Sequence, residues 1–188
     1  MKDKNSKDKR KVIFLDVDGV LNCKHTEERI WGEDGKFEYV GIEDQKVELL
    51  AKIIGATGAV IVLTSTWRKN KVRNVNDGLT NLDDVDDATT ADSLKNGLTP
   101  YLYLQEKLKK VGLQIFDNTP DSGLVFGRGR EIRAWLDSHP EVSNYVILDD
   151  EEFWDFRECG LEDHIVCTRF ISGLTEDTVE DAIRVLLQ

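Results

Sequence analysis

Five short apolar runs, separated by longer stretches with a helical pattern, constrain the fold of this 188-residue chain more than any other feature. Each run is rich in β-branched or aromatic residues and is bounded by polar residues or glycine, which is typical of a buried strand. The runs occupy residues 12–15, 59–63, 113–116, 145–148 and 164–167.

Helical patterns fill most of the intervals between these runs, at residues 43–54, 101–111, 130–138 and 176–187. Strands that alternate with helices imply βαβ units, and continuously apolar strands imply a sheet that is covered on both faces. The sequence therefore predicts an α/β, three-layer, Rossmann-like fold with a five-stranded parallel sheet. In such sheets ligands bind at the carboxyl ends of the strands, so the residues that directly follow each run carry the most information.

Composition excludes several classes of protein. No apolar run approaches the ~18 residues that a membrane-spanning helix needs, so we expect no membrane association. The three cysteines show no CxxC spacing, which argues against a disulfide framework or a zinc site and favours a cytoplasmic protein. The net charge of −11 disfavours contact with nucleic-acid backbones except at a local basic patch. No obligate protein partner is evident.

Three segments depart from the alternation of strands and helices. Residues 1–11 hold six basic side chains against two acidic ones, and we expect them to form a disordered leader. Residues 20–41 predict a small flap hairpin, and residues 70–99 a solvated polar insertion. We expect residues 12–188 to form a single domain.

Acids, hydroxyls and arginines follow the apolar runs or precede a helix. Two acids close the first run, hydroxyls follow the second, two acids close the fourth, and two arginines stand at the start of the third helical pattern. These residues are Asp16 and Asp18, Thr64 and Ser65, Asp149 and Asp150, and Arg128 and Arg130.

The gathered acids predict a metal site. Asp16 and Asp18 are two residues apart in extended chain, so their side chains point the same way. Together with Asp149 and Asp150 they repel one another unless a cation neutralises them. Mg²⁺ prefers oxygen ligands and commonly uses one or two carboxylates plus a substrate phosphate. A carboxylate beside such an ion can attack a phosphoryl group, and a second carboxyl can protonate the leaving oxygen.

Four segments resemble, in order, the motifs of haloacid dehalogenase (HAD) superfamily phosphatases. They are FLDVDGVLN at 14–22, VLTSTWR at 62–68, RGREIRAWL at 128–136 and VILDDEE at 146–152. The second and third are most similar to the HAD domain of Swiss-army-knife RNA repair proteins. The resemblance covers roughly residues 12–187, and four motifs in the expected order, each at a strand end or a helix start, are a specific signal. It implies that residues 12–188 form one catalytic domain. The hairpin at 20–41 is too small for the cap domain of this superfamily, and residues 70–99 are too polar to bury a core of their own, so we expect no large cap and an open site.

The resemblance implies a role for each matching residue. Asp16 is similar to the family nucleophile and Asp18 to its acid/base. Mg²⁺ is expected on the Asp16 side chain, the Asp18 backbone carbonyl and an acid of the Asp149–Asp150 pair. Which acid of that pair binds the metal directly stays open.

The phosphate-binding roles are assigned in the same way, with two alternatives. Thr64 matches the hydroxyl of the second motif, with Ser65 as the alternative. Arg128 matches the cation of the third motif, where the family usually has Lys, and Arg130 is the alternative. Ser65, Arg68, Arg130 and Trp31 are expected to contact substrate. The flap aromatics Trp31, Phe37 and Tyr39 are expected to roof the site and stack on a base.

These roles imply a Mg²⁺-dependent phosphatase that acts on a phosphate monoester through an aspartyl-phosphate. The resemblance favours nucleic-acid ends or nucleotides as the substrate. A small-metabolite or phosphoprotein phosphatase of the same superfamily is an alternative. So is a non-catalytic, receiver-like binding module, in which Asp117 after the third run takes the place of the phosphoacceptor.

Overall fold

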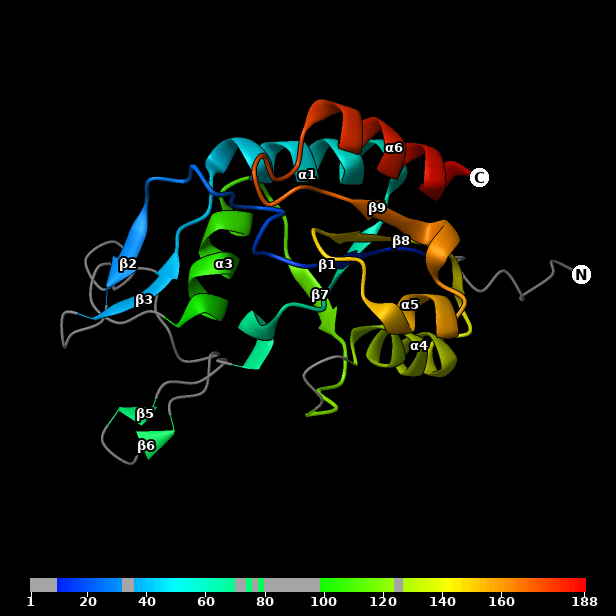
Figure 1. Cartoon of the computed structure of the whole chain (residues 1–188), viewed down its shortest axis with the longest axis horizontal. Coiled ribbons are helices and arrows are strands. Elements are labelled where there is room, and N and C mark those ends of the chain that lie inside the picture. Colours follow the sequence, from blue (N-terminus) through cyan, green and yellow to red (C-terminus); the bar gives the residue numbers. More distant parts are fainter. Residues whose placement is uncertain (1–9, 32–35, 70–73, 76–77, 80–98, 124–126) are drawn as a thin grey trace, which may run out of the picture.

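A five-stranded parallel sheet forms the centre of the protein in the computed structural model, as the apolar runs predict (Figure 1). The structure describes residues 10–31, 36–69, 74–75, 78–79, 99–123 and 127–188. The strand order is β7-β4-β1-β8-β9. The bounds are β1 Arg10–Leu15, β4 Val60–Leu63, β7 Ile115–Asn118, β8 Val142–Asp149 and β9 Ile165–Cys167.

The central strand β1 pairs in parallel with β4 on one side and with β8 on the other. From β1 the chain runs outward through β4 to β7 at one edge, then crosses back to β8 and continues to β9. The direction of winding therefore reverses between β1 and β8. Ligands of open α/β sheets bind at such a switch point, beyond the carboxyl ends of the strands. The residues that follow Leu15 and Leu148 therefore lie where a ligand is expected to bind.

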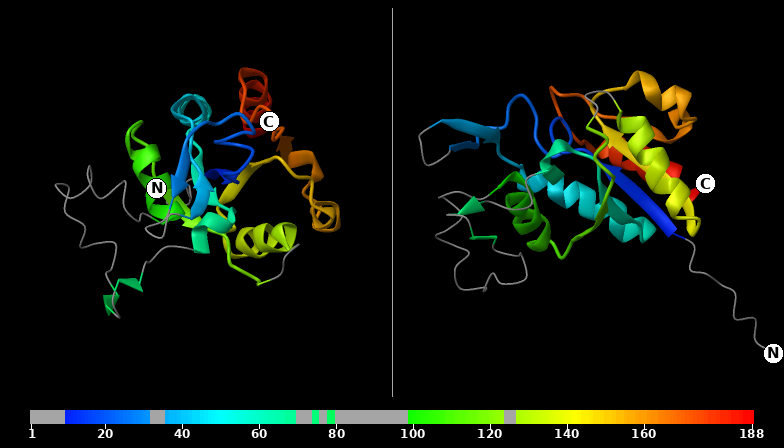
Figure 2. Two further views of the ribbon diagram at one scale, coloured as in Figure 1. Left: turned by 60° about the vertical axis from the view of Figure 1, so that its left-hand side comes forward. Right: turned by 90° about the horizontal axis from the view of Figure 1, so that it is seen from below.

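Helices cover both faces of the sheet (Figures 1 and 2). One face packs on α1 Asp44–Thr57, α3 Pro100–Lys109 and α6 Glu176–Leu187, and the other on α4 Arg128–Ser138 and α5 Trp154–Glu158. Along β1, Ile13 and Leu15 join the first core, whereas Val12 and Phe14 join the second. Because side chains alternate along a strand, a run that is buried at every position requires two covered faces.

Local signals explain where several helices begin and end. The Thr99 hydroxyl accepts a hydrogen bond from the backbone N–H of Leu102 and caps α3. Thr175 caps α6 in a reciprocal pair with Thr178. Gly58 ends α1 with φ +69°, a left-handed conformation that favours glycine.

The predicted strands and helices match the observed ones in type and order, with shifts of up to three residues at their ends. Helix α4 begins at Arg128, two residues before the predicted start, so both arginines lie inside its first turn. The short helix α5 was not predicted. Strand β1 begins at Arg10, within the predicted leader, of which residues 1–9 lie outside the described residues.

The flap hairpin is present as β2 Arg29–Trp31 paired antiparallel with β3 Phe37–Val40. The residues between the two strands, 32–35, lie outside the described residues. Most of the predicted insertion at 70–99 does too. The exceptions are Thr99, which caps α3, and the paired strands β5 Asn74–Val75 and β6 Gly78–Leu79. The absence of a large cap therefore stays a prediction. Two 3₁₀ helices, η1 Thr66–Lys69 and η3 Glu162–His164, complete the described elements.

In the part of the chain that the structure describes, no helix combines the length and the apolar content that a membrane crossing requires.

Candidate active site

Three carboxylates converge at the switch point of the sheet. Asp16 directly follows β1, and Asp149 and Asp150 stand at the end of β8. Each offers an oxygen that lies within 4.8 Å of the others. Asp16 is 6% exposed and Asp149 1%. The backbone N–H of Asp16 donates to the Leu148 carbonyl at 3.0 Å, which ties the two strand ends together. The structure thus brings together three of the four acids that the sequence predicted would meet, and Asp18 is not among them.

Arg128 is the cation that reaches these acids. Its Nη1 lies 2.8 Å from Asp16 Oδ1 and 2.5 Å from Asp149 Oδ2. The guanidinium also lies over the ring of Phe153, 4.8 Å from its centroid. A guanidinium held between two carboxylates, with several further N–H donors, is suited to binding a phosphate.

Arg130, the alternative to Arg128, lies elsewhere. Its side chain is exposed, its Nη2 is 3.5 Å from Glu158, and its guanidinium lies over the ring of Trp154. The structure therefore brings Arg128 to the acids and leaves Arg130 outside the cluster.

The first turn of α4 owes its position to Asp155, which is fully buried. The Asp155 Oδ2 accepts the backbone N–H of Arg130 at 3.1 Å. A Cβ at Gly129 would come within 2.8 Å of the Asp155 carbonyl oxygen, so only glycine allows this approach. The RGR sequence thus seats the helix start that carries Arg128.

Asp18 is exposed, and its carboxylate is not one of the three that cluster. Its Oδ1 accepts a hydrogen bond from Asn22 Nδ2 and its Oδ2 one from Trp67 Nε1, each at 2.9 Å. Both contacts fix the direction of the carboxylate. Sequence reasoning missed them, although Asn22 and Trp67 belong to the first and second motifs, and that was the available signal.

Of the two hydroxyl residues that directly follow β4, Ser65 faces the site and Thr64 lies in the interior. Ser65 lines a cavity of about 400 Å³ together with the acids and Arg128, and its side chain opposes the rise in the pKa of Asp16. Thr64 is fully buried and does not line this cavity, and its Oγ1 has no hydrogen-bond partner among the residues that the structure describes. Of the two alternatives for the second motif, the structure brings Ser65 to the site rather than Thr64.

Arg68 does not lie where a substrate ligand is expected. It is 7% exposed, and its Nη2 lies 2.5 Å from Glu131 Oε2 on α4. Its Nη1 donates to the backbone carbonyls of Thr64 and Ser65. The prediction that Arg68 contacts substrate does not fit this burial. The residue holds the loop after β4 against α4 instead.

Trp31 is also placed differently from the expectation. It is 55% exposed on β2, and its ring meets that of Phe37 edge to face with 5.8 Å between the centroids. Trp31 does not line the cavity of the acids, nor a second cavity that its neighbours Phe37 and Tyr39 line. The flap thus presents Phe37, rather than Trp31, toward the site.

A family model described as the HAD domain in Swiss Army Knife RNA repair proteins matches residues 12–179. The chain belongs to this family. The match confirms the resemblance that the four motifs carry, and the fold agrees with a HAD domain. No curated protein and no solved structure matches the chain.

As a HAD domain the chain has a HAD-type hydrolase or phosphatase site, and the receiver-like alternative loses its basis. Asp117, its phosphoacceptor candidate, lies on the edge strand β7. There Asp117 Oδ2 accepts a hydrogen bond from Trp135 Nε1 at 2.7 Å. The acids of the HAD site follow β1 and β8 instead.

The charges of the HAD site favour a metal ion. Burial and the nearby charge of Asp16 raise the pKa of Asp149 to about 7 and that of Asp150 to about 6. Burial raises the pKa of Asp16 as well, against the opposing effect of Arg128. Among the described residues, the carboxylates outnumber the one guanidinium that contacts them, and they supply only oxygen ligands. This donor set fits a hard divalent cation such as Mg²⁺.

Proposed function

We propose that this HAD domain is a Mg²⁺-dependent phosphatase that hydrolyses a phosphate monoester through an aspartyl-phosphate on Asp16. The observation that carries the proposal is the position of Asp16. This carboxylate is buried, lies 2.8 Å from Arg128, and opens into the same cavity as Asp18. A nucleophile, a cation for the phosphoryl oxygens and a second carboxyl group thus face one space.

The reaction follows from these positions. The Asp16 carboxylate attacks phosphorus, the bond from phosphorus to the leaving oxygen breaks, and Asp18 gives its proton to that oxygen. Asp18 then takes a proton from a water molecule, whose oxygen attacks phosphorus and releases phosphate and Asp16. Arg128 and the Ser65 hydroxyl offset the charge on the phosphoryl oxygens in both steps.

The metal would be held by Asp16 and the Asp149–Asp150 pair, with the Asp18 backbone carbonyl as the ligand that the resemblance adds. When bound, Mg²⁺ neutralises the acids and the charge that develops on the phosphoryl oxygens. The substrate that we propose is a nucleic-acid end or a nucleotide, because the matched family is described from RNA repair proteins. The three cysteines are free, which suits the cytoplasmic location that we also propose.

Hydrolysis of p-nitrophenyl phosphate with and without Mg²⁺ tests the proposal. We expect turnover that depends on the metal and falls by roughly 10⁴-fold in Asp16→Asn, because the nucleophile is lost. Asp137→Asn, an exposed aspartate on α4, is the matched control and should keep full activity. Absence of Mg²⁺-dependent turnover in the wild type would overturn the proposal.

A further inference from the structure

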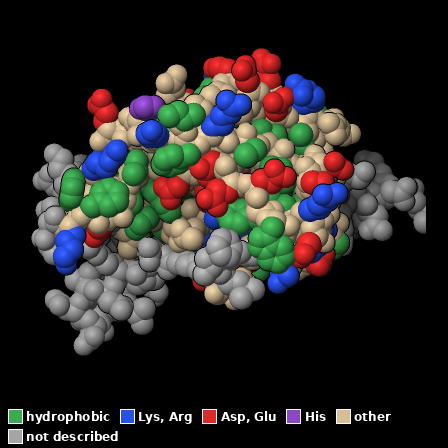
Figure 3. Space-filling view, viewed as in Figure 1, with side chains coloured by type: hydrophobic (Ala, Val, Ile, Leu, Met, Phe, Trp, Pro, Cys, Tyr) green, Lys and Arg blue, Asp and Glu red, His purple; other side chains and the backbone are tan. Residues whose placement is uncertain are grey.

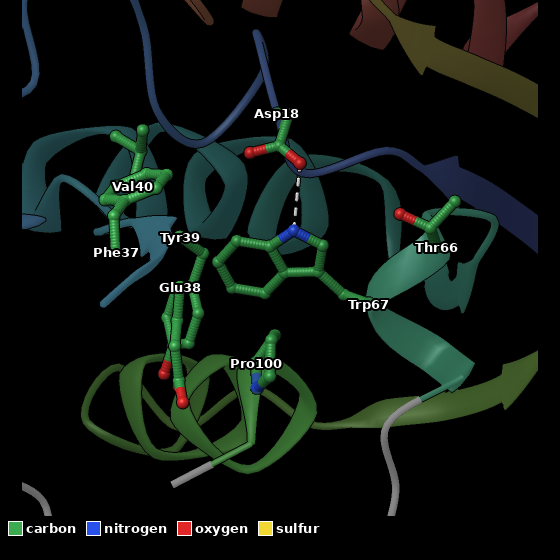
Figure 4. A pocket seen from close by; sticks show the side chains of 8 residues that line it. All are labelled: Asp18, Phe37, Glu38, Tyr39, Val40, Thr66, Trp67 and Pro100. Atoms are coloured by element: carbon green, nitrogen blue, oxygen red, sulfur yellow. Dashed lines mark hydrogen bonds between the residues drawn. The ribbon is translucent and has the colours of Figure 1, made fainter. Parts of the chain in front are cut away.

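A second cavity, of about 480 Å³, adjoins the cavity of the acids. Asp18 and Thr66 line both, so the two meet at these residues. Figure 4 shows the Trp67 indole between Asp18 and Pro100, with flap residues 37–40 on one side and Thr66 on the other. The second cavity therefore lies between the flap, η1 and the start of α3.

The walls of this cavity are aromatic and held in place. The ring of Tyr39 lies 5.1 Å from that of Trp67 and 5.7 Å from that of Tyr103 on α3. The Tyr103 hydroxyl accepts the backbone N–H of Ile42 at 3.1 Å, which fastens the base of the flap to α3. Phe37 contacts Trp31 edge to face and is 50% exposed, so the uncovered part of its ring can stack on a ligand.

The charge of the residues that line the second cavity also limits which ligands it can bind. Its described lining residues include two acids, Asp18 and Glu38, and no Lys or Arg. A phosphate in this cavity would lie beside the Asp18 carboxylate, and the described lining residues offer it no cation, which is unfavourable. The cavity thus differs from its neighbour, where Arg128 contacts the acids.

We infer that the second cavity binds the leaving group of the substrate, and that this group is uncharged, nucleoside-sized and aromatic. The inference rests on the proposed function: if Asp18 protonates the leaving oxygen, the leaving group begins at Asp18, where the cavities meet. Its ring stacks on Phe37, and its hydroxyls or amines donate to the Glu38 carboxylate. Cavities of ~300–1,000 Å³ hold ligands of this size. A free mononucleotide fits, whereas a strand end places a further phosphate in the acidic cavity.

Three substrates test the inference with Mg²⁺ present: adenosine 5′-monophosphate, adenosine 3′,5′-bisphosphate and glycerol 2-phosphate. Whichever phosphate of the bisphosphate reacts, the other must enter the second cavity. We expect kcat/KM for the monophosphate to exceed that for each of the other two by at least about 10-fold. Since stacking contributes ~1–3 kcal/mol per base, Phe37→Ala should lower the advantage of the monophosphate over glycerol 2-phosphate by about 5-fold or more.

Matched variants distinguish a role of Phe37 in substrate binding from a general loss of activity. Phe37→Tyr keeps the ring and should restore the preference. Phe116→Ala removes an aromatic ring that is 46% exposed on β7 and does not line the cavity, and should change nothing. Glu38→Gln removes one charge and should narrow the penalty on the bisphosphate.

The substrate assays distinguish failure of this inference from failure of the proposed function. Equal kcat/KM for the monophosphate and the bisphosphate, or equal losses on all substrates in Phe37→Ala, would overturn the inference while p-nitrophenyl phosphate turnover keeps the proposed function. If the wild-type protein turns over none of these substrates, p-nitrophenyl phosphate included, both the inference and the proposed function are overturned.

Discussion

The two cavities that meet at Asp18 are built from different kinds of residues. The first lies at the carboxyl ends of β1 and β8 and contains buried acids that contact a guanidinium. The second lies under the flap and is lined by aromatic rings with two acids and, among the described residues, no basic side chain. In Figure 3 acidic side chains gather at the middle of one face, with apolar side chains on either side.

The difference between the two cavities implies that the first carries out the reaction and the second selects the substrate. Asp149 is 1% exposed, so its charge depends on fixed partners in the interior, and any change there alters the reaction itself. Phe37 is half-exposed on a hairpin, so its replacement alters only what the ring contacts. We therefore expect changes in the first cavity to lower turnover equally on all substrates. Changes in the second should alter the ratio between substrates.

The largest test of this comparison is Arg128→Ala. The variant removes the cation that contacts Asp16, so kcat/KM should fall by about 10²- to 10³-fold, and by the same factor for the monophosphate and glycerol 2-phosphate. Arg130→Ala, two residues along the same helix, should stay within about twofold of the wild type, as is usual for exposed side chains outside a site. If Arg128→Ala lowers kcat/KM by different factors for the two substrates, or if Arg130→Ala lowers it as much as Arg128→Ala does, the proposed division of roles between the two cavities is wrong.

The sequence predicts the first cavity better than the second. The apolar runs place Asp16 and Asp149 at strand ends, and parallel strands bring such ends to one edge of the sheet. The choice between Arg128 and Arg130 needed the structure, because it depends on where α4 begins. That start is set by Asp155, a contact between residues that lie 25 positions apart.

Long-range contacts also explain the residues whose place was not predicted. Arg68 follows a strand end like a ligand, yet its partner Glu131 comes 63 residues later, and no local pattern shows the pair. Trp31 and Phe37 look alike in the sequence, and only the geometry of the hairpin decides which one lines a cavity. Trp67 reaches Asp18 across 49 residues.

The next test concerns the ion pair beneath the first cavity. Glu131→Gln leaves the Arg68 guanidinium buried without its counter-charge, which should cost about 3 kcal/mol in the free energy of unfolding. Since Arg68 also holds the Ser65 carbonyl, kcat should fall on all substrates by one common factor. Denaturant unfolding and the three-substrate assay measure the two effects.

Two further variants control for charge alone. Asp181→Asn breaks an exposed pair with Arg184 on α6 and should cost at most about 0.5 kcal/mol. The double variant Arg68→Met, Glu131→Leu removes both buried charges and should be more stable than Glu131→Gln, because no unpaired charge remains. A single variant as stable as the wild type would show that the pair does not support the site.

The smallest expected effect concerns the metal, and it depends on pH. The pKa of Asp149 is about 7 and that of Asp150 about 6, both above the ordinary value of 3.8, so between these values the folded chain holds protons that the unfolded chain releases. These groups therefore stabilise the metal-free fold below about pH 4 and lose that contribution as pH rises to 7. A divalent cation needs the deprotonated acids, so its stabilisation should grow with pH.

At ten times its Kd, Mg²⁺ adds about 1.4 kcal/mol, or roughly 3–6 °C in Tm for a chain of this length. Thermal unfolding with and without Mg²⁺ should show this increase at pH 8 and little of it at pH 5. Asp149→Asn should lose the increase, whereas Phe37→Ala should keep it, because the ring lies in the other cavity. An increase that is independent of pH, or one that Phe37→Ala abolishes, would mean that the two cavities do not divide metal binding from substrate choice.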